Sequence, residues 1–231
     1  MAFYYKLGRI PRKRHTQFRK DDGSLFSEEL ISTEGFNSLY SLVYHAHPPT
    51  LVKEIGDPID VTPKVAEAKN MKSRSFVTFK TPPADDYLES RTALLVNSDV
   101  QIGVAAPKNS MVDYFFKNAD SDEVLFIHEG SGKLKTIYGE ISFEYGDYLV
   151  IPRGCIYQLH FNDNTNRILV IESPTPIYPP KRYQNSFGQL LEHSPYCERD
   201  IKLPENLKTH DELGDFKVMI KKQNLIYPYT Y

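Results

Sequence analysis

The middle of the chain carries two strand patterns that are anchored by glycine. In the first, Glu123 is followed by six residues and Gly130, and in the second, Gly146 is followed by five residues, Pro152 and Gly154. Glycine allows the left-handed backbone that tight turns require, and proline ends a strand because it has no amide hydrogen to donate. Short strands joined by such turns favour an antiparallel barrel or jelly roll over a fold in which strands alternate with helices.

The strand signal is densest in residues 93–173. Apolar runs with short Gly, Asn and Asp connections predict strands within 93–107, 111–116, 123–130, 133–139, 140–146, 147–152, 156–161 and 167–173. A period of two places Ile141, Phe143 and Tyr145 on one strand face and Glu140, Ser142 and Glu144 on the other. The sequence NDNTN at 162–166 predicts a hairpin turn. We therefore expect a mainly β protein with little helix.

Three regions follow from these signals. We expect residues 1–92 to form an N-terminal arm and an irregular β segment that packs on the barrel. Residues 93–173 are expected to form the barrel core, and residues 174–231 a proline-rich extended segment, a loop and a final strand. The aromatic end at 224–231 (NLIYPYTY) has no polar tail, so we interpret it as a docking segment or as the junction to a further domain.

The flanking regions also contain local signals for short elements. These predict strands at 4–8, 37–45 and 216–222, helices at 64–70 and 186–193, and a loop at 81–86 with an Asp cap. The first 20 residues are rich in Lys and Arg, with apolar and aromatic residues among them. A nuclear or transit signal can have this composition, but we favour an ordered arm whose charges meet acidic groups of this fold or of a partner subunit.

Composition excludes several classes of function. A formal net charge of -2 gives no bulk attraction to nucleic acid. No apolar run approaches the roughly 20 residues that a membrane span needs, and the N-terminus lacks the apolar core of a secretion signal. Cys155 and Cys197 form no C-x-x-C pair and are interpreted as reduced thiols. We expect a cytoplasmic protein without nucleic-acid or membrane partners.

The two glycine-anchored patterns resemble the motifs of cupin barrels. Metal-binding cupins have an H-x-H pair shortly before the Glu and a third His three residues after the Pro-x-Gly. Here the H-x-H positions fall within Phe116, Lys117, Asn118 and Ala119, and the third position is Tyr157, so only Glu123 is retained. One carboxylate without imidazoles is a poor ligand set for Fe(II), Mn or Zn. We expect a metal-free barrel filled by side chains, with Glu123 and Tyr157 as degenerate positions.

Other candidate sites are weaker. His45 and His47 form a second H-x-H pair, followed by Glu54, which could hold a metal or could simply be polar residues at a strand end. Four further histidines stand alone in strand-like or loop-like sequence, and these are His128, His160, His193 and His210. No nucleophile elbow, Walker loop or dinucleotide fingerprint is present. We therefore assign no catalytic, cofactor-binding or metal-binding residue to this chain.

Longer blocks extend the resemblance beyond the barrel. They lie at 4–19 (YYKLGRIPRKRHTQFR), 28–36, 44–50 (YHAHPPT), 100–107, 115–154, 180–200 and 220–231 (IKKQNLIYPYTY). With these blocks the chain resembles the N-terminal part of homogentisate 1,2-dioxygenase in its shorter bacterial form, over essentially its whole length.

The resemblance implies an enzyme that opens the ring of homogentisate with O2 to give maleylacetoacetate in phenylalanine and tyrosine breakdown. It implies Fe(II) held by two His and one Glu, and subunits that associate as trimers or hexamers. In the family these iron ligands lie in a second, C-terminal domain, and no residue here matches their motif. The resemblance therefore implies that this chain is the first domain, that the C-terminal domain is missing, and that the fragment alone is inactive.

Two other interpretations stay open. The chain could be a stand-alone metal-free cupin that binds a small aromatic acid or a partner subunit, with Arg153 or Lys181 meeting the carboxylate. It could also be a metal-dependent enzyme that uses His45, His47 and Glu54.

Overall fold

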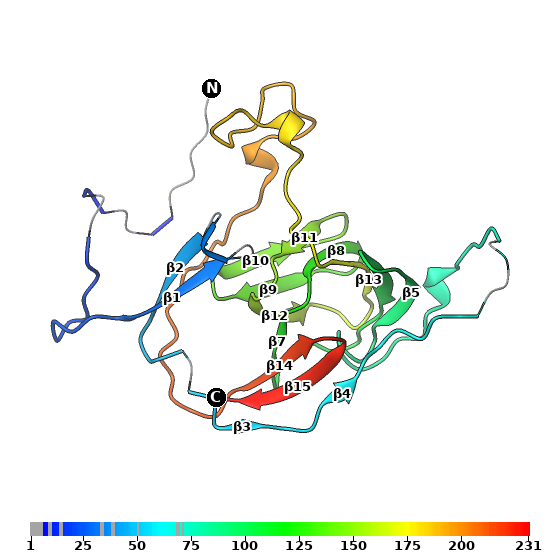
Figure 1. Ribbon diagram of the computed structural model, residues 1–231, viewed down its shortest axis with the longest axis horizontal. Helices are drawn as coiled ribbons and strands as arrows, with labels where there is room; N and C mark the ends of the chain where they lie inside the picture. Colours follow the sequence, from blue (N-terminus) through cyan, green and yellow to red (C-terminus); the bar gives the residue numbers. More distant parts are fainter. Residues whose placement is uncertain are drawn as a thin grey trace.

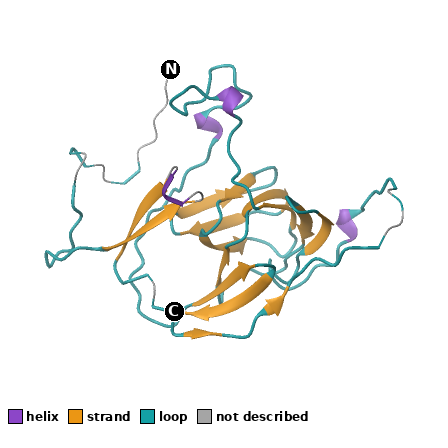
Figure 2. Cartoon of the chain, in the orientation of Figure 1, coloured by secondary structure: helices purple, strands orange, loops and turns teal. Residues whose placement is uncertain are grey.

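The computed structural model describes residues 7–8, 11–13, 16–32, 35–37, 40–49, 51–67, 70 and 72–231. Their regular structure is almost entirely β, and helix is confined to single 3₁₀ turns (Figures 1 and 2). The strands are β1 (Ser27–Ser32), β2 (Tyr40–His45), β3 (Glu54–Ile55), β4 (Ile59–Asp60), β5 (Thr92–Val96), β6 (Gln101–Ala105), β7 (Phe115–Asn118), β8 (Asp122–Glu129), β9 (Gly132–Thr136), β10 (Gly139–Phe143), β11 (Tyr148–Ile151), β12 (Ile156–Phe161), β13 (Arg167–Ser173), β14 (Lys217–Lys222) and β15 (Leu225–Thr230). The 3₁₀ turns are η1 (Gly35–Asn37), η2 (Thr78–Lys80), η3 (Lys181–Tyr183) and η4 (Glu198–Asp200).

Two sheets form the body of the molecule. One has the order β10-β9-β12-β7-β14-β15-β3, with β4 also paired to β15, and the other has the order β11-β8-β13-β6-β5. The strands of both sheets pair antiparallel, except that β14 runs parallel to β7. A separate ribbon of β1 and β2 lies to one side (Figure 1). The expected mainly β architecture, of antiparallel barrel or jelly-roll type with little helix, is confirmed.

The hydrophobic core lies between the inner faces of the two sheets. On β8, Leu125 and Ile127 are buried, whereas Phe126 and His128 are half-buried on the outer face, because successive side chains of a strand alternate. The inner faces contribute apolar side chains from eight strands of the two sheets, among them Ala105, Phe116, Leu125, Ile127, Leu134, Phe143, Leu149, Ile151, Tyr157, Leu159, Ile168 and Val170. Burying each large apolar side chain stabilises the fold by about 1.5–3 kcal/mol.

The aromatic C-terminal segment is itself a strand. β15 pairs antiparallel with β14 and also pairs with β3 and β4. Phe216 and Tyr231 exchange two backbone hydrogen bonds of 3.1 and 3.0 Å beyond the ends of this hairpin. The segment expected to dock therefore docks on the sheet of its own chain.

The turn between β14 and β15 has an uncommon backbone. Gln223 and Asn224 both have positive φ, at 54° and 58°, the signature of a two-residue type I′ turn. The carboxylate of Asp120 accepts hydrogen bonds from their backbone amides at 2.7 and 3.2 Å. Asp120 thereby ties the hairpin to the connection between β7 and β8.

The prediction of a hairpin turn at 162–166 is wrong. These residues join β12 to β13, which lie in different sheets, so the chain crosses from one sheet to the other. Turn residues predict a change of direction, but they do not determine which strands pair afterwards. The Asn166 side chain fixes this crossing, because it donates to the carbonyl oxygens of Pro107 (3.1 Å) and Asp163 (2.8 Å).

The predictions of two short helices are also wrong for the residues that the structure describes. Residues 64–67 and 70 form no helix, with 68 and 69 outside the described residues, and 186–193 form turns. Val65 is 76% exposed and Phe187 is 88% exposed, so neither segment buries an apolar face that would stabilise a helix.

Smaller expectations had mixed outcomes. The Asp cap is confirmed, because Asp86 accepts the amides of Leu88 (2.9 Å) and Glu89 (3.1 Å), although it caps a turn. Tyr145 does not share the face of the buried Phe143, because β10 has already ended and Tyr145 is 71% exposed. Residues 4–6 of the expected first strand lie outside the described residues.

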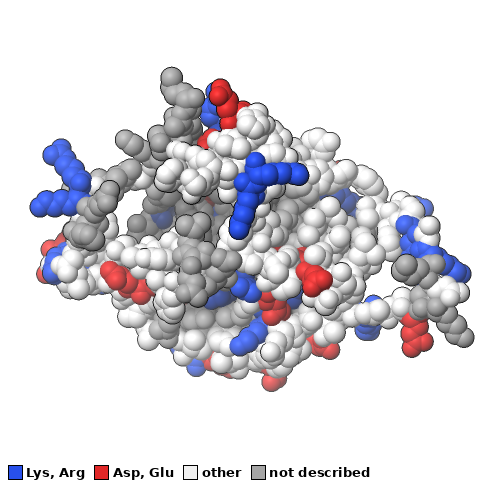
Figure 3. All heavy atoms as spheres, turned by 45° about the horizontal axis from the view of Figure 1, so that its top comes forward, with Lys and Arg blue, Asp and Glu red and all other residues white. Residues whose placement is uncertain are grey.

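The surface carries charges of both signs. On the face shown in Figure 3, the described Lys and Arg side chains are interspersed with Asp and Glu among mostly uncharged residues. No helix in the described part of the chain has the length and apolar content that crossing a membrane requires.

Candidate functional site

The positions that correspond to cupin metal ligands meet inside the barrel. On β7, alternation turns Phe116 and Asn118 inward, so these two residues stand where an H-x-H pair would stand. Glu123 on β8 and Tyr157 on β12 are fully buried beside them. The rings of Phe116 and Tyr157 meet edge to face, with centroids 5.5 Å apart.

Glu123 accepts hydrogen bonds from three side chains. The Tyr157 hydroxyl donates to Oε2 at 2.7 Å, and the Tyr87 hydroxyl donates to Oε1 at 3.4 Å. Nη1 of Arg91 donates to Oε1 at 3.2 Å. Burial raises the pKa of both phenols well above the ordinary value, so both stay protonated and remain donors. Of the three donors to Glu123, only the Arg91 guanidinium therefore carries a positive charge.

A second carboxylate lies directly opposite the first. Glu172 on β13 is the cross-strand partner of Glu123 on β8, and both side chains point inward. Like charges at such a pair are destabilising unless cations separate them. Nη2 of Arg91 lies 2.9 Å from Glu172 and Nζ of Lys221 contacts both its carboxylate oxygens at 2.8 and 2.9 Å. Arg91 therefore bridges the two carboxylates.

Asn118 completes the network. Its Nδ2 donates to Glu172 at 2.6 Å, and its Oδ1 accepts the backbone amides of Asp120 and Ser121, each at 3.0 Å. One side chain therefore satisfies a buried carboxylate and closes the turn between β7 and β8. A side-chain amide has both a donor and an acceptor, so Asn118 can bind the carboxylate and the two backbone amides at the same time.

The network balances two carboxylates against two cations. Burial raises the pKa of Glu172, but Arg91 and Lys221 outweigh this effect and hold the pKa at about 2. Burial raises the pKa of Glu123, with Arg91 opposing the shift. We refer to Arg91, Glu123, Glu172 and Lys221 as the ionic centre. Buried charges of this kind require partners, because desolvation costs several kcal/mol per ion.

The residues of the ionic centre do not fit an Fe(II) ion. Fe(II) sites of oxygenases use two imidazoles and one carboxylate with open positions. Here the inward-facing residues supply no imidazole, both oxygens of Glu123 are already acceptors, and Arg91 adds a competing positive charge. In the described ranges no three His, Cys, Asp or Glu side chains are grouped as a metal site would require. The centre is built to hold strands together.

His45, His47 and Glu54 have separate partners. His45 Nε2 lies 2.8 Å from a carboxylate oxygen of Glu29, and His47 Nε2 lies 3.0 Å from the carbonyl oxygen of Asp211. Glu54 belongs to β3, at the edge beside β15. The structure thus engages the two imidazoles with different parts of the chain.

The other singled-out residues are also dispersed. Arg153 donates to the carbonyl oxygen of Pro174 at 3.3 Å, and Lys181 is exposed in η3. Both cysteines are free thiols, and burial raises the pKa of Cys155 to about 12, which makes it unreactive at neutral pH. His160 contacts Gln158 at 3.1 Å, and burial lowers its pKa.

Three further histidines of the described residues lie outside the barrel interior. His193 is exposed, and His210 is exposed with its Nδ1 3.3 Å from Glu212. His128 is on the outer face of β8.

The sequence interpretation missed Arg91, Glu172 and Lys221. Glu172 stands at an inward-facing position of the largely apolar strand β13, which is a signal that could have revealed it, whereas Lys221 lies in a strand with two further lysines. Arg91 precedes β5 and has no comparable signal.

The fold defines this molecule as a cupin-like β protein, and its interior holds an ionic centre. Solved cupin structures resemble it: a cupin-2 protein from Shewanella frigidimarina (24% identity, TM-score 0.32, 36% of this chain and 79% of that one) and a cupin superfamily protein from Desulfitobacterium hafniense (18%, 0.33, 36% and 74%).

Sequence comparisons identify the family more narrowly. Residues 66–224 match the model of the family described as "Homogentisate 1,2-dioxygenase N-terminal", and the chain belongs to this family. A "Putative dioxygenase" of Saccharolobus solfataricus is 41% identical over 226 residues, which are 97% of this chain and 57% of that protein. "Homogentisate 1,2-dioxygenase" of Bradyrhizobium diazoefficiens is 33% identical over 79 residues, 32% of this chain and 18% of that protein. The chain thus spans little more than half the length of the Saccharolobus relative.

Proposed function

We propose that this chain is the N-terminal domain of a homogentisate 1,2-dioxygenase, which uses O2 to open the ring of homogentisate and gives maleylacetoacetate. In this proposal Fe(II) is the cofactor of the whole enzyme, and residues of a C-terminal domain outside this chain hold it. The family match and the relative of nearly twice this length support the proposal.

The observation that carries the proposal is the ionic centre. Arg91 and Tyr157 already occupy the oxygens of Glu123, the one carboxylate retained from the cupin ligand set. Because this interior is unsuited to iron, the oxidative chemistry belongs to another part of the enzyme. The domain contributes a rigid scaffold whose two sheets are joined through Glu172 on β13 and Lys221 on β14.

The proposal extends to assembly and location. We propose a cytoplasmic homo-oligomer, a trimer or hexamer of the full-length protein. Tyr148 (66% exposed) and Val150 (51% exposed) project side by side from the outer face of β11 and give subunit contacts an apolar surface.

Anaerobic Fe(II) titration and O2 uptake with homogentisate test the proposal. The chain alone is expected to retain no stoichiometric iron and to consume no O2. A chimera serves as the positive control. It joins this chain to the part of the Saccharolobus protein that lies beyond the matched 57% of its length. The chimera is expected to retain one Fe(II) per chain and to consume O2 with homogentisate.

Two results would contradict this proposal in different ways. One equivalent of iron retained by the chain alone would show that the metal site is here. An iron-loaded chimera that consumes O2 with a different phenol but not with homogentisate would show that the substrate is wrong.

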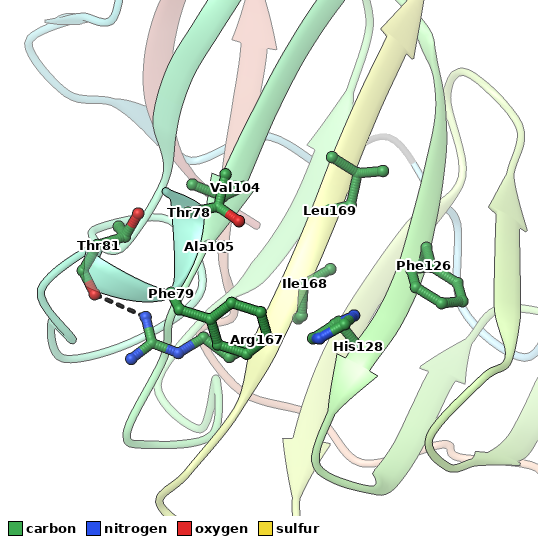
Figure 4. A pocket seen from close by; sticks show the side chains of 10 residues that line it. All are labelled: Thr78, Phe79, Thr81, Val104, Ala105, Phe126, His128, Arg167, Ile168 and Leu169. Carbon is green, nitrogen blue, oxygen red and sulfur yellow. Dashed lines mark hydrogen bonds between the residues drawn. The ribbon is translucent and has the colours of Figure 1, made fainter. Parts of the chain in front are cut away.

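A second candidate function is a metal-free cupin that binds a small aromatic acid. The observation that favours it is an apolar pocket on the outer face of the barrel (Figure 4), and no residue of the ionic centre lines this pocket.

A further inference from the structure

The outer pocket is formed where η2 folds over the five-stranded sheet. Residues of β6, β8 and β13 line it on the sheet side, and Thr78, Phe79 and Thr81 line it on the other side. Its volume is about 190 Å³. In Figure 4 the rings of Phe79 and His128 lie close together above the strands, and their centroids are 4.8 Å apart.

The lining is mainly aromatic and aliphatic. Phe126 from β8 and Leu169 from β13 face outward as cross-strand neighbours, and Phe79 covers them from η2. An apolar cavity of about 150 Å³ is large enough to hold benzene. The pocket therefore has room for a single six-membered ring with a short substituent.

Two polar groups reach this apolar space. Arg167 donates from Nη1 to the carbonyl oxygen of Thr81 at 2.6 Å, and its Nε lies 3.9 Å from Glu129, beyond hydrogen-bond distance. The other guanidinium N–H groups, and both ring nitrogens of His128, have no hydrogen-bond partner among the residues that the structure describes. The guanidinium N–H groups and the imidazole N–H of His128 are available to an acceptor within the pocket.

The combination of shape and charge selects one class of ligand. A flat ring fits between aromatic side chains, and a guanidinium pairs with a carboxylate through strong, directed hydrogen bonds. Glu129 is 45% exposed and its Oε2 lies 3.9 Å from Nε of Arg167, so it screens the cation only in part. We propose that the outer pocket binds a monocyclic aromatic carboxylate, with its ring against Phe79 and Phe126 and its carboxylate at Arg167 and His128.

This site is separate from the iron chemistry of the proposed function and does not depend on it. It also differs from the earlier interpretation in which Arg153 or Lys181 receives the carboxylate, because neither residue lines the pocket. Arg153 is therefore a matched control for Arg167.

The test is a titration of the 231-residue chain with benzoate and phenylacetate, followed by two-dimensional NMR. For a ligand of this size in a half-open pocket we expect a dissociation constant on the order of 1 mM. Amide signals of Phe79, His128 and Leu169 are expected to shift with one common saturation curve. Benzamide keeps the ring without the charge and acetate keeps the charge without the ring, so both are expected to bind at least about tenfold more weakly.

Variants then assign the carboxylate and ring positions. Arg167→Gln is expected to weaken benzoate binding about tenfold or more, and Arg153→Gln is expected to leave it unchanged. Leu169→Trp fills the pocket and is expected to abolish binding. If Arg167→Gln does not fold, the map of shifted amides in the unaltered chain decides the location.

Three outcomes would overturn the inference. These are an absence of saturable shifts up to 20-fold above the expected dissociation constant of roughly 1 mM, shifts that map away from η2 and β8, and benzoate binding that is lost in Arg153→Gln but kept in Arg167→Gln.

Discussion

At the scale of single residues, the ionic centre shows how charged side chains can be held inside a barrel. Tyr157 stands where cupins place a histidine, and its hydroxyl donates to Glu123 at 2.7 Å. Arg91 supplies the positive charge that this carboxylate needs when it is removed from water. Each buried polar atom of the centre that we describe has its partner within the protein, so the centre adds order to the core without leaving a reactive group.

Removal of one cation from the ionic centre is expected to be costly. Lys221→Met keeps the length of the side chain but leaves Glu172 with Arg91 as its one cationic partner among the described residues. Breaking a buried pair on one side typically destabilises a protein by about 3–5 kcal/mol. Urea denaturation at pH 7 measures the loss. Lys202→Met is the matched control, because Lys202 is 49% exposed and its pair with Asp147 is worth at most about 1 kcal/mol. Equal losses for the two variants would contradict the structural role of Lys221.

At the scale of elements, the β14–β15 hairpin depends on its turn. Type I′ turns favour Asn followed by Gly, because both residues need positive φ. Gln223 is poorly suited to its φ of 54°, because a residue with a Cβ adopts the left-handed region at a cost. The turn is retained because Asp120 accepts both backbone amides.

Gln223→Asn is therefore expected to stabilise the protein by roughly 0.5 kcal/mol, since asparagine adopts the left-handed region at lower cost. Asp120→Ala is expected to act in the opposite direction, by about 1–2 kcal/mol, because two amides lose a charged acceptor. Thermal unfolding followed by circular dichroism compares the two. A lower melting temperature for Gln223→Asn would contradict this account of the turn.

The elements also show what could be predicted from the sequence. Each strand from β5 to β13 overlaps one of the predicted runs, although the bounds differ, because apolar patterning and tight turns are local properties. The pairing of β12 with β9 and β7 was not predictable from NDNTN, and neither was the parallel contact of β14 with β7. Glu123 and Tyr157 were identified by their place in a motif, whereas Arg91 reaches Glu123 only through the tertiary fold.

At the scale of the whole molecule, acid is expected to act mainly through the interior. Asp22, Asp60 and Glu212 also have lowered pKa values, but they are fully exposed and contribute little. The pKa of Glu172 is about 2 in the folded state against an ordinary 4.5. The unfolded chain therefore takes up this proton first, so the stabilisation is complete above pH 4.5 and is lost as the pH falls toward 2.

Glu172→Gln is expected to flatten this dependence. Denaturant midpoints measured from pH 6 to about pH 2.5 should fall less in the variant than in the unaltered protein, although the variant starts from a lower value. Glu123→Gln is the control with the opposite sign, because the raised pKa of Glu123 favours the folded state on acidification. An unchanged slope in Glu172→Gln would contradict the pKa assigned to this group.

The sequence positions of the two cations limit how far the polypeptide can be trimmed. Arg91 comes just before β5 and Lys221 lies near the end of β14, yet both neutralise carboxylates carried by β8 and β13. A fragment reduced to the central strands would bring two carboxylates face to face with neither counter-ion present. Electroneutrality at the centre of the barrel requires segments from both sides of the sequence, so the shortest self-sufficient folding unit reaches at least from Arg91 to Lys221.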